Sequence, residues 1–136
     1  MAVLADAKTV GAPFEGNSEL VRVTYDFAND TGATADYTVL TAESACIVEC
    51  EYLIVETEVD SAMDGTVLDL GKAAGGTQFF SNLAEAALGA DAINAPTAEN
   101  RFVELTAGEL IVLGIETEAA TAGKFHMVFR IHKKPF

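Results

Sequence analysis

Apolar and polar residues alternate along several short stretches of the chain, and this alternation predicts β-strands. Val21, Val23, Tyr25 and Phe27 alternate with polar residues, which is the period-two pattern of a half-buried strand. Residues 29–32 then supply turn chemistry, and a short strand is expected over 37–41.

The longest β pattern covers residues 46–59, where both faces carry apolar residues. One face holds Cys46, Val48, Cys50, Tyr52 and Ile54, and the other holds Ile47, Leu53, Val55 and Val59 with several acids. This pattern fits a central strand, or a strand that changes face at a bulge. Asp64-Gly65 predicts a hairpin into a further strand over 66–70.

The second half contains one segment with helical spacing and then returns to strands. Phe79, Phe80, Leu83, Ala84, Ala87 and Leu88 predict one short helix, with Gly89 at its end. Residues 90–100 are expected to form a loop, because Pro96 disfavours a regular strand. Three strands follow over 102–105, 110–119 and 124–132, and a turn at 121–123 precedes the last.

Strand-length runs separated by turns indicate an all-β fold, expected as an antiparallel, jelly-roll-like β-sandwich with one short helix. Residues 1–19 show no sustained period and are expected to form an extended N-terminal arm, leaving 20–136 as a single sandwich domain. The 136 residues suit one domain, and half of them are hydrophobic, which is enough for a sizeable core.

The charge of the chain is strongly acidic. Eight Lys and Arg face 21 Asp and Glu, for a net charge of −13, so nucleic-acid binding is not expected. The excess suits either simple surface solvation or a basic partner surface. Four cations, Lys124, Arg130, Lys133 and Lys134, lie in the last 13 residues, which contain no acid. This basic tail is expected either to close onto its own domain or to meet an acidic face of a neighbouring subunit.

The sequence shows neither a signal peptide nor an apolar run of the roughly 20 residues that a membrane span needs. A soluble chain made in a cytoplasm, without membrane contact, is therefore expected.

Two cysteines and two histidines are the first candidates for chemistry. Cys46 and Cys50 would lie about 13 Å apart in a regular strand, too far for the roughly 7 Å that a disulfide allows. They are interpreted as buried core thiols. His126 and His132 point away from the apolar face of Phe125, Met127, Phe129 and Ile131 and would be about 20 Å apart. They are interpreted as solvated or interface residues.

The acids and glycines give no catalytic motif. Asp60, Asp64 and Asp69 flank the expected hairpin and could bind a cation such as Ca²⁺, but EF-hand spacing is missing. Gly71, Gly75 and Gly76 lack the pattern of a phosphate-binding loop. We therefore expect no catalytic residues, no cofactor-binding residues, no metal ligands and no enzyme activity.

The order of these segments resembles small virion proteins of tailed bacteriophages. The segments are Val-Thr-Tyr-Asp-Phe at 23–27, the Val/Ile/Thr strand at 52–59, a strand ending in Leu-Gly at 66–71, the Phe-containing segment 79–88, and Thr-Ala-Gly-Lys leading into 121–132. Together they cover about residues 20–132.

The resemblance implies a capsid decoration, or cement, protein at the capsid surface of a virion. Its implied partner is the major capsid protein, and its implied state is a homo-oligomer, with a trimer favoured. A tail or fibre component remains an alternative. From the residues themselves, a carbohydrate- or ligand-binding β module is the other alternative, although Trp is absent.

Overall fold

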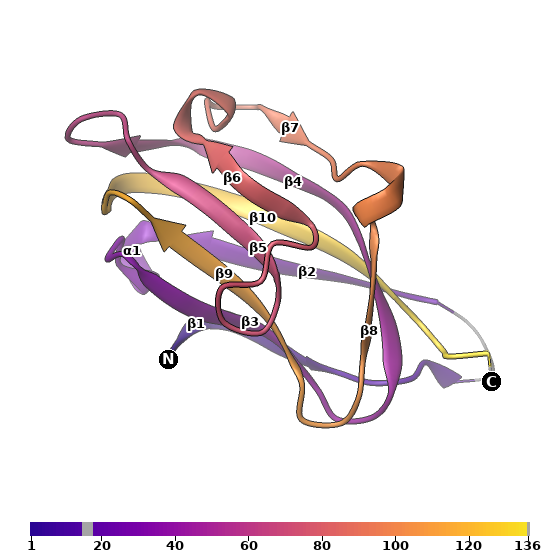
Figure 1. Cartoon of the computed structure of the whole chain (residues 1–136). Helices are drawn as coiled ribbons and strands as arrows, with labels where there is room; N and C mark the ends of the chain where they lie inside the picture. The colour runs from indigo at the N-terminus through magenta and orange to yellow at the C-terminus, as the bar shows by residue number, and fades with distance from the viewer. Residues whose placement is uncertain (15–17, 136) are drawn as a thin grey trace.

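The computed structural model describes residues 1–14 and 18–135, and these residues form two packed β-sheets (Figure 1). Sheet A has the strand order β1-β3-β9-β5-β6, and sheet B has the order β2-β10-β4-β7, with β8 also paired to β4. The strands are β1 Ala2–Val10, β2 Glu19–Asp26, β3 Ala35–Ala42, β4 Cys46–Ser61, β5 Val67–Lys72, β6 Phe80–Ala84, β7 Ile93–Asn94, β8 Phe102–Leu105, β9 Leu110–Glu116 and β10 Ala120–His132. The all-β sandwich predicted from the sequence is confirmed.

Successive strands mostly alternate between the two sheets. If β7 and β8 are taken as one broken edge strand, the chain from β2 to β10 has the eight-strand order of a jelly roll. The first and last of these strands, β2 and β10, are antiparallel neighbours in sheet B. This order accounts for one failed prediction. Asp64-Gly65 does not close a hairpin, because β4 lies in sheet B and β5 in sheet A.

The core lies between the sheets and is filled by the alternating residues that the sequence predicted. Phe125, Met127, Phe129 and Ile131 of β10 are all fully buried. Tyr25 of β2 stacks on Phe125 with ring centroids 4.9 Å apart. Its hydroxyl donates to the Thr31 carbonyl at 2.6 Å, so the polar end of this buried ring keeps a partner.

Strand β4 changes face at a bulge, which was one of the two readings of its sequence. Its register against β10 shifts where Phe129 pairs with Cys50 and Val128 pairs with Tyr52, leaving Glu51 as the extra residue. Before the bulge, Cys46, Val48 and Cys50 face the core; after it, Leu53 and Val55 do. Tyr52 is thereby turned outward.

The expected arm is wrong for Ala2–Val10, which form strand β1 in parallel with β3 at the edge of sheet A. Only Leu4 and Val10 of this strand are fully buried, so its sequence has no regular alternation. The register shifts between Val3 and Lys8, where β1 bulges away from β3. Residues 15–17 of the expected arm lie outside the described residues.

The helix expected over 79–88 is also wrong. Phe80–Ala84 form strand β6 against β5, and Glu85–Ala87 form a single 3-10 turn. A helix would bury one continuous stripe, whereas here Phe79, Phe80 and Leu88 enter the core separately. The α-helical turn in the structure is α1, Phe27–Asp30, capped by the Asp26 carboxylate, which accepts from the Ala28 N–H.

The expected turn at 121–123 is instead part of β10. The chain reverses before Ala120, and Gly123, with φ 138°, sits where the register of β10 against β4 is irregular. Glycine fits this position because an added Cβ would lie 2.9 Å from Val59 Cγ2. No helix in the described part of the chain is long and apolar enough to cross a membrane.

Candidate functional site

The two cysteines lie in the core, as the sequence predicted. Cys46 and Cys50 are fully buried free thiols on the inward face of β4. Burial raises the pKa of Cys50 to about 12 and also raises the pKa of Cys46. A thiol reacts as the thiolate, so these side chains act as small hydrophobes rather than as nucleophiles.

The two histidines lie on the outer face of sheet B, and each contacts an acid of β4. His126 Nε2 is 2.9 Å from Glu56 Oε1, and His132 Nε2 is 2.8 Å from Glu49 Oε1. The pKa of Glu56 is lowered, first by its hydrogen bond with His126 and then by that with Lys124. Both histidines are partly exposed, which agrees with the solvated or interface interpretation.

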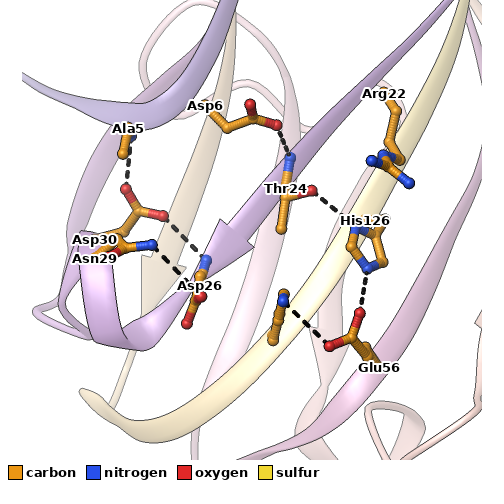
Figure 2. A pocket seen from close by; sticks show the side chains of 10 residues that line it. Ala5, Asp6, Arg22, Thr24, Asp26, Asn29, Asp30, Glu56 and His126 are labelled. Atoms are coloured by element: carbon orange, nitrogen blue, oxygen red, sulfur yellow. Dashed lines mark hydrogen bonds and ion pairs between the residues drawn. The ribbon is translucent and has the colours of Figure 1, made fainter.

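A polar hollow of about 540 Å³ lies where the first strands of the two sheets meet (Figure 2). Strands β1, β2, β4 and β10 and helix α1 all contribute to its lining. The ten lining residues are Ala5, Asp6, Arg22, Thr24, Asp26, Asn29, Asp30, Glu56, Lys124 and His126. Four carboxylates, two permanent cations and one histidine therefore meet in one open depression.

Two aspartates in this hollow tie β1 to the β2 side of the sandwich. Asp6 accepts from the Thr24 N–H at 2.8 Å, and Asp30 accepts from the Ala5 N–H at 2.7 Å and the Asp26 N–H at 3.0 Å. β2 is an edge strand whose other side pairs with β10, so the Thr24 N–H has no ladder partner. The bulge in β1 brings Asp6 to this unpaired donor and thereby protects an exposed edge.

Thr24, His126 and Glu56 form a chain that resembles a nucleophile, base and acid. Thr24 Oγ1 lies 2.7 Å from His126 Nδ1, and Glu56 binds the other ring nitrogen (Figure 2). With neutral His126 donating from Nε2 to Glu56, the Thr24 hydroxyl donates to Nδ1. Catalysis of acyl transfer also needs donors for an oxyanion. The Thr24 N–H is instead bound by the Asp6 carboxylate, which would oppose that charge. The geometry suits a structural network.

Asp60, Asp64 and Asp69, the candidate cation ligands of the sequence analysis, do not lie together in the structure. Asp69 is buried on β5 and accepts from the Asn82 N–H at 2.7 Å. Asp60 and Asp64 instead lie with Glu85, and their ligand atoms are within 4.8 Å of one another. Glu85 is already bound by the Ser61 hydroxyl at 2.5 Å. Because Ca²⁺ takes about six to eight oxygen ligands, these three carboxylates alone make an incomplete shell.

The basic tail closes onto its own domain. Arg130 binds Glu51 at 2.9 Å, Lys134 binds Glu104 at 2.5 Å, and Lys124 binds Glu56 at 3.2 Å. The partners of the tail are thus acids on strands β4 and β8 of sheet B, the sheet that contains β10. Of the two arrangements that the sequence left open, the structure supports the intramolecular one.

The outer face of sheet B also carries apolar side chains that sequence reasoning did not single out as a group. Register and alternation place seven of them there: Leu20, Ile47, Tyr52, Ile54, Ile93, Phe102 and Val128. Tyr52 is 39% exposed, and Leu20, Ile93 and Phe102 are more exposed still. The sequence does show that both faces of residues 46–59 carry apolar side chains. Only the bulge at Glu51 decides which of these side chains face outward.

Comparison with known proteins gives one similar fold. No protein-family model and no curated protein sequence matches the chain. Among solved structures, a chain of the cyanophage Pam1 capsid asymmetric unit superposes with a TM-score of 0.61. The match covers 92% of this chain and 91% of that chain at 21% sequence identity. At this identity the likeness concerns the fold.

Proposed function

We propose that the protein is a non-enzymatic structural component of a bacteriophage virion, acting as a capsid decoration protein. One observation carries the proposal: the jelly-roll sandwich matches, over 92% of its length, a chain from a cyanophage capsid asymmetric unit. The resemblance of the sequence to small virion proteins points the same way. The partner on this proposal is the major capsid protein, and the location is the capsid surface.

The features of the site are consistent with packing rather than chemistry. The thiols are buried, the Thr24–His126–Glu56 chain has a carboxylate where an oxyanion donor is needed, and the acidic group near Asp64 is incomplete as a metal shell. A decoration protein adds buried surface across the joints between capsid subunits. Each bound copy thereby raises the free energy needed to separate them.

The test is made on virus particles from the source of the chain. We expect the protein to co-sediment with purified capsids in a fixed ratio, and we expect particles lacking it to break open at a lower temperature. A small acidic protein of similar charge, added to the same particles, is the control for non-specific adhesion. Absence of the chain from purified particles would overturn the virion assignment. Equal disruption temperatures with and without it would overturn the decoration role, and labelling restricted to tails would replace it with the tail alternative.

The proposal that the protein is not an enzyme can be tested at the polar hollow. We expect the unaltered protein to hydrolyse activated esters no faster than the uncatalysed reaction does. We expect Thr24→Val and His126→Ala to leave that rate unchanged. A rate that is above the uncatalysed reaction and falls in both variants would refute the non-enzymatic assignment. The carbohydrate-binding alternative is tested by a glycan array, and none of the ten residues lining the hollow is an aromatic platform residue.

A further inference from the structure

The loop that joins β4 to β5, at one end of the sandwich, contains the dipeptide Asp64-Gly65 (Figure 1). It is the only place in the sequence where glycine follows Asp or Asn. In an Asp-Gly dipeptide the amide nitrogen of the glycine reaches the aspartate side chain easily, because glycine has no Cβ to hinder the approach. Asp64 is exposed, so water has access to the reacting groups. The loop therefore contains the groups needed for a change in its own main chain.

This change rearranges the main chain with water as the only co-reactant. The Gly65 nitrogen forms a bond to Asp64 Cγ, and the side-chain hydroxyl leaves with the amide proton as water. The product is a five-membered succinimide ring. Water then opens the ring at the main-chain carbonyl carbon of Asp64, and the chain afterwards runs through the side-chain carboxyl, as an isoaspartate. The water lost in the first step is regained in the second, so nothing is oxidised or reduced.

The nitrogen that would attack is held by two acceptors. The Gly65 N–H donates to Glu118 Oε1 at 2.9 Å and to Ser61 Oγ at 3.1 Å. Glu118 Oε1 also accepts from the Met63 N–H at 3.1 Å. One carboxylate oxygen, from the connection between β9 and β10, thus fixes the main chain on both sides of Asp64. Hydrogen bonds to an ionised acceptor are stronger than those between neutral groups.

The Asp64 carboxylate has no comparable restraint. None of the described residues donates a hydrogen bond to it, and its neighbours are the carboxylates of Asp60 and Glu85, with oxygen atoms within 4.8 Å of one another. To form the ring, the Gly65 nitrogen must turn away from Glu118 and approach Asp64 Cγ. The carbon that is attacked is therefore free, while the nitrogen that attacks is held. The hydrogen bonds at Gly65 are the point of control.

We propose that Asp64-Gly65 is a latent site of self-modification, which the Glu118 carboxylate keeps in the aspartate form. It does so by holding the Met63 and Gly65 N–H groups together, an arrangement we name the Glu118 clasp. Conversion to isoaspartate adds a methylene group to the main chain between these two N–H groups, so one oxygen can no longer accept from both. The next residue, Thr66, is tied to the same segment, since its hydroxyl donates to the Glu118 carbonyl at 2.9 Å. A single conversion therefore loosens this end of the sandwich.

The reaction concerns the purified chain alone, so its test is independent of the proposed virion role. The protein is incubated in warm, mildly acidic buffer, both folded and in guanidinium. Isoaspartate at position 64 is measured by the loss of cleavage with endoproteinase Asp-N and by labelling with isoaspartyl methyltransferase. We expect conversion in the folded protein to be at least about 10-fold slower than in the unfolded chain, because opening the clasp breaks charge-assisted hydrogen bonds.

Three variants separate the clasp from the general effect of folding. Glu118→Ala removes the acceptor and should raise the rate in the folded protein about 10-fold, toward the rate of the unfolded chain. Glu118→Gln keeps an oxygen acceptor and should stay within about 3-fold of the unaltered protein. Glu116→Ala is the matched control, because it removes a carboxylate two residues earlier that accepts no hydrogen bond from the described residues. It should leave the rate unchanged.

Each result decides the proposal. Equal rates in the folded and unfolded chains overturn it. A lower rate in Glu118→Ala also overturns it, since the carboxylate would then act as a base that takes the amide proton. Circular dichroism establishes that the variants are folded during incubation. If Glu118→Ala is not, amide hydrogen exchange of the unaltered protein gives the answer: a protected Gly65 N–H together with slow conversion supports the clasp, and an unprotected one overturns it.

Discussion

Strand β1 provides a direct test of how the chain begins, because its sequence predicts an arm and the structure has a docked strand. The informative change is Leu4→Ala, since Leu4 is only 2% exposed and belongs to the core cluster. Val3→Ala is the matched control, because the neighbouring Val3 is 64% exposed in the same strand. If β1 is docked in solution, the two variants must differ in stability.

The expected difference follows from the burial. Replacing a fully buried Leu by Ala removes its transfer free energy and leaves a cavity, at a cost of about 2–5 kcal/mol. Leu4 lies in an edge strand that can settle partly into the space, so we expect about 3 kcal/mol. Val3→Ala removes little buried surface and should cost less than about 0.5 kcal/mol. Against a typical total of about 5–15 kcal/mol, the loss at Leu4 is easily measured.

Urea unfolding followed by far-UV circular dichroism is the assay, because the chain has no Trp to serve as a fluorescent probe. We expect Leu4→Ala to lower the urea midpoint without changing the m-value, and to lower the melting temperature by about 10 °C. Equal and small losses in both variants would refute the docking of β1. The first residues would then form the free arm that the sequence indicates.

Three further results are expected. Burial raises the pKa of Cys50 from 9.0 to about 12. At pH 8 its thiol should therefore react with a thiol reagent about 1,000-fold more slowly in the folded protein than in guanidinium. Fast labelling of the folded protein would contradict the place of Cys50 in the core. Gly32→Ala should destabilise by about 3 kcal/mol, because an added Cβ would lie 1.9 Å from the Ala120 carbonyl oxygen. Gly89→Ala, where a Cβ meets nothing within 4 Å, is its control in the same thermal assay. The hydrogen bond from Lys72 lowers the pKa of Glu109 to about 2, so this pair stabilises the fold above the ordinary carboxyl pKa of 4.5 and ceases to do so as pH falls toward 2. In acid unfolding, Glu109→Gln should flatten the pH dependence in that window, and an unchanged profile would show that the pair contributes nothing.

The candidate site shows how far single residues can be interpreted from sequence. The burial of Cys46 and Cys50 and the outward position of His126 and His132 follow from strand alternation alone, and the structure confirms them. The expected grouping of Asp60, Asp64 and Asp69 is wrong. It requires the turn at Asp64 to join neighbouring strands of one sheet. Asp69 therefore lies apart, and Glu85 takes the place beside the other two.

Local pattern determined the elements whose burial repeats with the period of a strand. β2, β4, β8 and β10 were predicted near their observed positions, since one apolar face in water forces such segments to pack in that register. The same reasoning fixed the sandwich class. It failed at β1, at β6 and at the short β7, Ile93–Asn94, which lies within the loop expected over 90–100. In these strands the buried residues are too few or too irregularly spaced to reveal a strand.

The tertiary structure alone decided which strands share a sheet and which side chains meet on its outer face. A turn such as Asp64-Gly65 reverses the chain equally well within a sheet or between sheets, so its sequence carries no information about the choice. The bulge at Glu51 cannot be read from local sequence either. Its one extra residue turns Tyr52 outward beside Val128. Composition sets the net charge at −13, but only the pairing of β10 with β4 brings Lys124 to Glu56 and Arg130 to Glu51. Contacts between residues distant in sequence depend on the pairing of whole strands, and no local pattern encodes that pairing.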